Sequence, residues 1–143
     1  MEANKLISEE LFFNVEFYDV DSMKIVWHGN YVKYMEKARC RLLDKIGFNY
    51  LRMEEIGVAF PIVEIKFKYI RSLHFGEKVR ALATLEEWEN RLKISYEFYN
   101  AESGLLTTKA SSTQMAVNKK TGETMFVCPQ ELIDKVENYV EEK

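Results

Sequence analysis

Residues 30–47, NYVKYMEKARCRLLDKIG, decide how the chain folds. Apolar side chains recur in this stretch every three or four residues, which places them on one stripe of a helix. The stripe consists of Tyr31, Tyr34, Met35, Ala38, Leu42 and Ile46. Asn30 is a residue type favoured at a helix N-cap, and Gly47 stands where glycine ends many helices. The spacing therefore predicts a helix of about 16 residues with one face to bury.

Alternating apolar residues predict strands on both sides of this helix. Before it, residues 11–17 place Leu11, Phe13, Val15 and Phe17 at every second position, which is typical of a strand with one buried face. After it, a short helical turn is expected over residues 50–56. Four strands follow, over residues 63–69, 78–88, 92–98 and 105–117, separated by turns at 74–77, 89–90 and 103–104. A last helix follows Pro129 and carries Leu132, Ile133, Val136 and Val140 on one side.

This order of elements indicates the α+β class. A strand and a long helix precede four consecutive antiparallel strands, and only one sheet is available to cover the apolar stripe of the helix. The simplest arrangement is a curved antiparallel β-sheet wrapped around the long α-helix. Neither a repeat nor a linker interrupts the sequence, so we expect a single domain over residues 1–143.

Composition and charge exclude several classes of function. The 143 residues include 20 Lys and Arg and 23 Asp and Glu, with both signs interspersed, so we expect attraction neither to nucleic acid nor to an anionic membrane. The first residues, MEANKLISEE, lack the basic and apolar regions of a secretory signal. We expect a cytoplasmic protein in which Cys40 and Cys128 are reduced thiols. Neither cysteine lies in a CxxC motif, so a structural zinc site is not expected.

The segment FYDVDSMKIVWHGNY, residues 17–31, contains the candidate chemistry. Asp19 and Asp21 lie at the end of the first strand, and a loop containing His28 leads into the helix. Free N–H groups at a helix N-terminus favour developing negative charge, and a nearby carboxylate can attack a carbonyl or activate water. These are the parts needed to cleave an acyl compound. On pattern alone, paired acids in loops are more often solvated or capping residues, and a single histidine is more often only hydrogen-bonded.

The same segment resembles the signature of a known family. Tyr18-Asp19-x-Asp21, followed by Val26-x-His28-x-Asn30-Tyr31-x-x-Tyr34-x-Glu36-x-Ala38-Arg39, is similar to the motif of the 4-hydroxybenzoyl-CoA thioesterase family, which includes the YbgC-type thioesterases. Similarity continues through residues 60–63 and 75–77, so it spans nearly the whole chain. The resemblance implies the hotdog fold and hydrolysis of an acyl-CoA to the free acid and CoA, with neither cofactor nor metal.

The resemblance also implies roles for single residues. The catalytic aspartate of the family corresponds to Asp21, and the backbone N–H that receives the thioester carbonyl lies near His28. Asn30 and Tyr31 match the pair that shapes the helix start and the acyl pocket. Asp19 is expected to be a structural support, bonded to loop amides. The acyl pocket could be lined by Trp27, Met23, Phe60 and Tyr69.

The sequence offers several candidate cations for the CoA phosphates. Some relatives use a basic run after a Glu-Trp pair, but here Glu87-Trp88 is followed by a run in which only Arg91 keeps the charge. Other candidates are Lys66, Lys68 and Arg71, although each alone is more often an ordinary solvent-facing residue. A second departure is Lys24, which stands where many members have glycine. It should alter the loop conformation and adds a positive charge near the site.

The resemblance implies a homodimer with sites at the subunit interface, commonly paired into a homotetramer as a dimer of dimers. Tyr96, Phe98 and Tyr99 are also hard to bury together in one small domain, so we expect some of them to contact a partner subunit. Two alternatives remain for the activity: the same hydrolysis on an acyl carrier protein, or a non-catalytic hotdog protein that binds acyl-CoA. A dehydratase is disfavoured, because the aspartate lies in the thioesterase motif.

Overall fold

The computed structural model of the protein describes residues 7–141. Its elements, in chain order, are β1 Ser8–Asn14, the 3-10 helix η2 Phe17–Asp19, α1 Asn30–Ile46, α2 Tyr50–Glu55, β2 Val58–Ala59, β3 Ile62–Tyr69, β4 Lys78–Glu87, β5 Leu92–Asn100, β6 Leu106–Gln114, β7 Ala116–Asn118, β8 Thr124–Met125 and α3 Gln130–Glu141. The predicted long helix, the short helical turn after it and the last helix are all present. The α+β class is confirmed.

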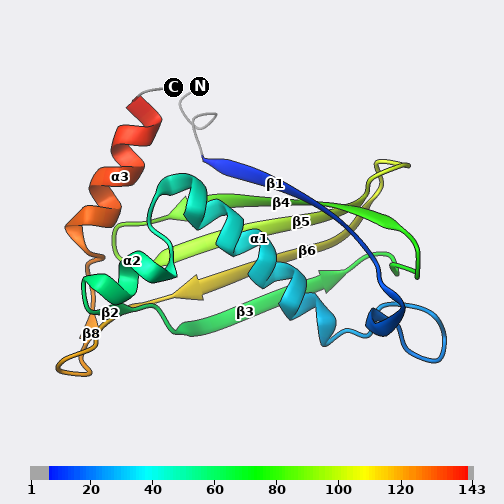
Figure 1. The fold of residues 1–143 in the computed structure, drawn as a ribbon, viewed down its shortest axis with the longest axis horizontal. Coiled ribbons are helices and arrows are strands. Elements are labelled where there is room, and N and C mark those ends of the chain that lie inside the picture. Colours follow the sequence, from blue (N-terminus) through cyan, green and yellow to red (C-terminus); the bar gives the residue numbers. More distant parts are fainter. Residues whose placement is uncertain (1–6, 142–143) are drawn as a thin grey trace.

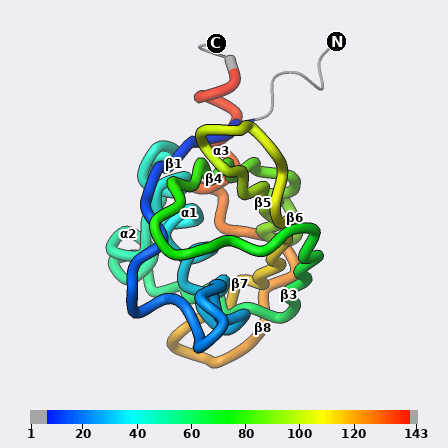
Figure 2. Tube along the Cα trace, turned by 90° about the vertical axis from the view of Figure 1, so that its right-hand side faces the viewer, coloured from blue at the N-terminus to red at the C-terminus, as the bar shows by residue number. Residues whose placement is uncertain are grey.

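A curved five-stranded sheet wraps around α1, as predicted (Figures 1 and 2). Its order is β1-β4-β5-β6-β3, and every neighbouring pair is antiparallel. Although β3 precedes β4 in the chain, it pairs with β6 and forms the far edge of the sheet. A small second sheet of three strands, β2-β7-β8, lies beyond the end of β6.

The core lies between α1 and the middle strands of the sheet. All six residues of the predicted apolar stripe of α1 are buried. Facing them on β4 are Val79, Ala81, Ala83 and Leu85, each without exposed surface. The small alanines in the middle of this row leave room for the helix to approach the sheet closely. The core therefore follows directly from the two periodicities in the sequence.

The two ends of α1 differ in how well they were predicted. Gly47 ends the helix with φ of 90°, and its N–H donates to the carbonyls of Leu43 and Asp44, as expected of a C-terminal glycine. The prediction of Asn30 as N-cap is wrong, because Gly29 occupies that position and Asn30 is the first helical residue. The Asn30 side chain is used elsewhere: its Nδ2 donates to the carbonyl oxygen of Asp19 at 2.7 Å.

Two strand predictions also need correction. The expected strand over residues 105–117 is split at Met115 into β6 and β7, and β7 leaves the main sheet to pair with β2 and β8. β2 and β8 have two residues each, too few for alternation to reveal them. Phe17 does not extend the buried face of the first strand, because β1 ends at Asn14 and Phe17 lies 76% exposed in η2.

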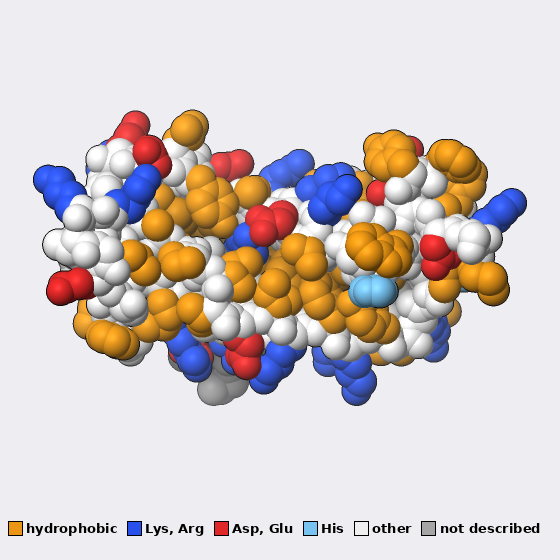
Figure 3. All heavy atoms as spheres, turned by 90° about the horizontal axis from the view of Figure 1, so that it is seen from below, with side chains coloured by type: hydrophobic (Ala, Val, Ile, Leu, Met, Phe, Trp, Pro, Cys, Tyr) orange, Lys and Arg blue, Asp and Glu red, His pale blue; other side chains and the backbone are white. Residues whose placement is uncertain are grey.

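The exposed apolar surface lies on β3 rather than on β5. Contrary to expectation, Tyr96 and Phe98 are fully buried within the chain, and Tyr99 packs beneath the guanidinium of Arg80, 4.4 Å from its ring centroid. On β3, by contrast, the side chains of Val63, Ile65 and Tyr69 are 58%, 37% and 50% exposed. Figure 3 views the molecule from the β3 side and shows hydrophobic side chains gathered along this edge.

Within residues 7–141, none of the helices combines the length and the apolar character needed to cross a membrane.

Candidate active site

The predicted catalytic loop is a short antiparallel hairpin. The Trp27 N–H donates to the Asp19 carbonyl at 3.0 Å, Val20 pairs with Val26, and the Asp21 N–H donates to the Ile25 carbonyl at 2.9 Å. These bonds align the two arms of the loop, so Asp21 lies close to the hairpin tip. The second arm leads directly into α1.

Asp19 fastens this hairpin to the rest of the protein. Its Oδ2 accepts hydrogen bonds from the Glu16 N–H at 2.9 Å and from the Tyr34 hydroxyl at 3.0 Å. Its carbonyl oxygen accepts from the Trp27 N–H and from the Asn30 amide. Burial, and then the hydrogen bond to this carboxylate, raise the pKa of Tyr34 well above its usual value, so the hydroxyl stays protonated and donates. Asp19 is a structural support, as expected.

Asp21 is exposed, and only one of its two carboxylate oxygens takes part in the hydrogen bonding of the hairpin. Its Oδ1 accepts the Met23 N–H at 2.8 Å, which fixes the orientation of the carboxylate. Its Oδ2 has no hydrogen-bond donor in the part of the chain that the structure describes. The residue borders a hollow of about 480 Å³ lined by Phe17, Tyr18, Val20, Asp21, Ser22, Lys24 and Phe75. The Asp21 carboxylate is therefore oriented by the turn and open to a ligand.

Lys24 holds the hairpin turn in a conformation that glycine adopts more easily. Its φ is 66°, the one positive value among the described non-glycine residues. The Lys24 N–H donates to the Asp21 carbonyl at 2.9 Å, and its own carbonyl accepts from the Phe75 N–H at 3.4 Å. The left-handed conformation costs an L-residue about 1–2 kcal/mol. The loop thus keeps the turn expected for glycine, although a lysine occupies the position.

The start of α1 presents free backbone donors beside a tryptophan. The N–H groups of His28 and Gly29 have no acceptor among residues 7–141. The Trp27 ring lies over Gly29 so closely that a Cβ there would be 2.3 Å from a ring carbon. Glycine is therefore required for this approach of ring to backbone. The Trp27 and His28 rings lie 5.3 Å apart, and both side chains are exposed.

An aromatic cluster joins the start of α1 to β3. Tyr31 is buried, and its ring centroid lies 5.1 Å from that of Tyr69 and 6.2 Å from that of Phe67. Burial raises the pKa of Tyr31, so its hydroxyl remains neutral. Because Tyr69 is half-exposed, the cluster reaches the surface at the β3 edge. The structure thus gathers the predicted residues Trp27, His28, Asn30, Tyr31 and Tyr69 around one helix terminus.

The cations predicted to hold CoA are spread over the sheet. Lys66 and Lys68 border a hollow of about 430 Å³ on the outer face of β3 and β6, together with Lys109. Arg71 donates from Nη1 to the Leu106 carbonyl at 2.9 Å.

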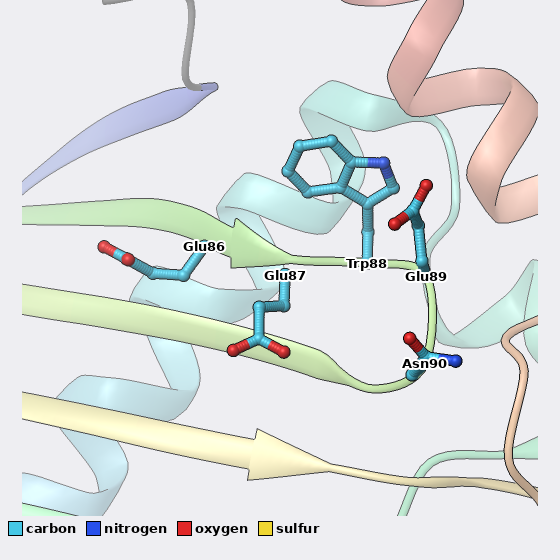
Figure 4. A pocket seen from close by; sticks show the side chains of 5 residues that line it. All are labelled: Glu86, Glu87, Trp88, Glu89 and Asn90. Atoms are coloured by element: carbon cyan, nitrogen blue, oxygen red, sulfur yellow. The ribbon is translucent and has the colours of Figure 1, made fainter. Parts of the chain in front are cut away.

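Arg91 lies in a different place from the other candidate cations. It lies in the β4–β5 turn, directly before β5 and at the end of β4 opposite to the catalytic loop. Its guanidinium donates to both carboxylate oxygens of Glu87 at 2.8 and 3.0 Å. The hollow at this hairpin is about 130 Å³ in volume and is lined by Glu86, Glu87, Trp88, Glu89 and Asn90 (Figure 4). The positive charge of Arg91 is therefore balanced within an acidic surround.

Met23 and Phe60, which are also expected at the acyl pocket, do not join this aromatic cluster. The Met23 side chain is exposed at the hairpin, and Phe60 is buried beside another hollow, of about 390 Å³, near α2 and β2. Sequence reasoning missed the aromatic walls of the Asp21 hollow, Phe17, Tyr18 and Phe75. The available signal was the presence of aromatic residues just before the acidic pair. Phe17 fits the alternation of a buried strand, and Tyr18 and Phe75 stand in the family motif without a predicted place in the site.

No group of three or more His, Cys, Asp or Glu side chains in the described residues could hold a metal ion.

Comparison with known proteins identifies the family. A model of the thioesterase-like superfamily matches residues 15–136. The chain belongs to this superfamily. It is 35% identical over 108 residues to a putative acyl-CoA thioesterase, YneP, from Bacillus subtilis (strain 168). The aligned residues cover 75% of this chain and 78% of the relative. The resemblance to thioesterases is thereby confirmed.

Solved structures confirm the fold. A DHNA-CoA thioesterase from Staphylococcus aureus has a TM-score of 0.80 and 27% identity, with 94% of each chain covered. A hypothetical protein from Aquifex aeolicus has a TM-score of 0.80 and 25% identity, covering 90% of this chain and 98% of that one. The antiparallel sheet wrapped around a long helix is the hotdog fold, as predicted.

The strained turn makes a prediction about stability. Lys24→Gly should raise the free energy of unfolding by about 1 kcal/mol, because relief of the left-handed strain exceeds the entropy that glycine adds to the unfolded chain. Ser22→Gly in the same hairpin is the matched control, and it should lower stability by up to about 1 kcal/mol, because Ser22 has no positive φ to relieve. Urea unfolding measures both. A loss of stability in Lys24→Gly equal to that in Ser22→Gly would contradict the strain.

Proposed function

We propose that the protein is an acyl-CoA thioesterase, which hydrolyses an acyl-CoA thioester to the free acid and CoA. One observation carries the proposal: in a member of the thioesterase-like superfamily, an oriented carboxylate with an unused oxygen opens into a hollow on the hairpin that leads to free helix N–H groups. The names of YneP and of the Staphylococcus aureus DHNA-CoA thioesterase support the same reaction class.

The proposed reaction uses Asp21 and the start of α1. The Asp21 carboxylate either attacks the thioester carbonyl carbon or takes a proton from water that attacks it. The carbonyl oxygen becomes an oxyanion, which accepts hydrogen bonds from the backbone N–H groups at His28 and Gly29 at the positive end of the helix dipole. The C–S bond then breaks, and the sulfur of CoA leaves as a thiolate that takes up a proton released from water. When water attacks, this step gives the free acid directly; when Asp21 attacks, it leaves an acyl-aspartyl anhydride, which water then hydrolyses to the free acid and the Asp21 carboxylate. Both routes require the carboxylate.

The remaining predicted residues surround this reaction in the proposal. Trp27, Asn30, Tyr31 and Tyr69 would shape the acyl site at the helix start. Lys68 and Arg71 would meet the CoA phosphates more readily than Arg91, because the Arg91 charge is balanced by Glu87. Hydrolysis of CoA thioesters fits the cytoplasmic location expected from the sequence.

Two alternatives give different results in the same assays. A thioesterase acting on an acyl carrier protein would release the thiol from the carrier faster than from CoA. A non-catalytic acyl-CoA-binding protein would bind acyl-CoA without releasing free thiol. The unused oxygen of Asp21 favours catalysis, since a binding protein has no need of an oriented and unpaired carboxylate beside its ligand.

We also propose that the protein is a homodimer formed through β3, with two dimers pairing into a homotetramer as the family resemblance implies. β3 is an edge strand with unpaired backbone groups and with exposed Val63, Ile65 and Tyr69. An exposed apolar edge strand is a template for pairing with another chain. Since Tyr69 contacts Tyr31, a partner on β3 would lie next to the start of α1.

Light scattering tests this assembly. The parent should be a dimer or tetramer at micromolar concentration, and Ile65→Arg should shift it toward monomer, because the arginine would place a charge in an apolar interface. Leu51→Arg is the control, since Leu51 is an exposed apolar residue on α2 and not on β3. A monomeric parent would contradict the interface, as would an Ile65→Arg variant with unchanged mass.

Replacing Asp21 tests the catalytic assignment. Asp21→Asn keeps the size and the oxygen that accepts the Met23 N–H but removes the negative charge. Release of free CoA, measured with a thiol reagent over short, long and aromatic acyl-CoAs, should fall in kcat by at least about 10²–10⁴-fold, with little change in KM.

Asp19→Asn is the matched control. Both hydrogen bonds to the Asp19 carboxylate go to one oxygen, which the amide retains, so this variant should stay active. Equal activity in Asp21→Asn and the parent would remove Asp21 from the mechanism. A parent that releases no CoA from any substrate, yet binds acyl-CoA, would favour the non-catalytic alternative.

A further inference from the structure

The positive charge of Lys24 makes no contribution to the described fold. Its backbone closes the hairpin turn through bonds to Asp21 and Phe75, and any residue able to adopt a positive φ could make them. Its ammonium group makes no ion pair with the acidic residues that the structure describes. A side chain that is held at a strained position without a structural partner is a reason to look for a functional role.

The surroundings of Lys24 indicate what that role is. Lys24 and Asp21 are the two charged residues among the seven that line the hollow. Phe17, Tyr18 and Phe75 form aromatic walls, and the rings of Phe17 and Phe75 lie 6.1 Å apart. Lys24 is therefore the one cation among these lining residues that can meet an anionic group of a ligand held against the aromatic walls.

We propose that Lys24 binds an anionic group of the substrate and thereby determines which thioesters the enzyme accepts. The inference rests on the proposed function, because a thioester carbonyl at Asp21 would bring the rest of the substrate within reach of Lys24. The shared chemistry is an oxyanion, which a flexible ammonium group with three N–H donors can follow. It could be a carboxylate on the acyl group or a phosphate of CoA.

Binding of thioether analogues, which cannot be hydrolysed, distinguishes the two sources. Four probes suffice: the alkyl and the carboxyalkyl thioethers of CoA, and the same two of pantetheine, which lacks phosphate. Each is titrated by calorimetry into the parent, Lys24→Asn and Lys24→Arg. Asparagine tolerates the left-handed turn, so Lys24→Asn removes the charge while keeping the loop, and Lys24→Arg restores a cation.

For every probe that carries the recognised anion, Lys24→Asn should weaken binding about tenfold, and Lys24→Arg should recover most of it. Loss confined to the carboxyalkyl probes assigns the anion to the acyl group, and loss confined to the CoA probes assigns it to phosphate. Unchanged binding of all four probes would overturn the inference, as would an equal loss that includes the neutral alkyl pantetheine.

The same proteins separate this inference from the proposed function. A parent that binds the probes but hydrolyses none of the matching thioesters contradicts the thioesterase alone. A parent that hydrolyses thioesters, together with a Lys24→Asn variant that binds every probe as the parent does, contradicts the role of Lys24 alone.

Discussion

The buried carboxylate of Asp19 is the interaction on which the candidate site depends. One side-chain oxygen accepts from the Glu16 N–H and the Tyr34 hydroxyl, while the carbonyl of the same residue accepts from the Trp27 N–H and the Asn30 amide. These four bonds join η2, the hairpin and the first turns of α1. A buried carboxylate that lost such partners would be strongly unfavourable, so the arrangement is held together cooperatively.

The two acids of the motif, Asp19 and Asp21, have different roles. Asp19 uses its Oδ2 and its carbonyl oxygen to position the hairpin, whereas Asp21 faces the hollow with an Oδ2 that accepts from no described residue. The same hairpin leads into α1 at the point where His28 and Gly29 offer free N–H groups. Positioned groups accelerate a reaction because orientation is settled before the substrate arrives. The fold and the proposed chemistry are thus connected through one buried residue.

Periodicity predicted the elements that bury one whole face. The stripe on α1 and the alternation in β4 and β5 were correct because burial dictates residue type at every inward position. What failed depends on contacts distant in sequence: Asn30 does not cap its helix because Asp19 takes its side chain, and β6 ends early because β7 finds other partners. Motif spacing marked Asp21 and the helix start, but Phe17, Tyr18 and Phe75 could not be placed around them before the hairpin was known.

Removing the hydroxyl of Tyr34 tests most directly whether the hydrogen bonds to Asp19 position the hairpin. Tyr34→Phe removes one bond to Asp19 and keeps the ring, whose contacts include Phe13 at 4.5 Å between centroids. We predict an unchanged circular dichroism spectrum, a free energy of unfolding lower by about 1.5–3 kcal/mol, and a kcat for acyl-CoA hydrolysis lower by about 10- to 100-fold, because the hairpin carrying Asp21 loses its alignment with α1. A folded Tyr34→Phe enzyme with the kcat of the parent would contradict the claim that this anchor positions the Asp21 carboxylate for the proposed reaction.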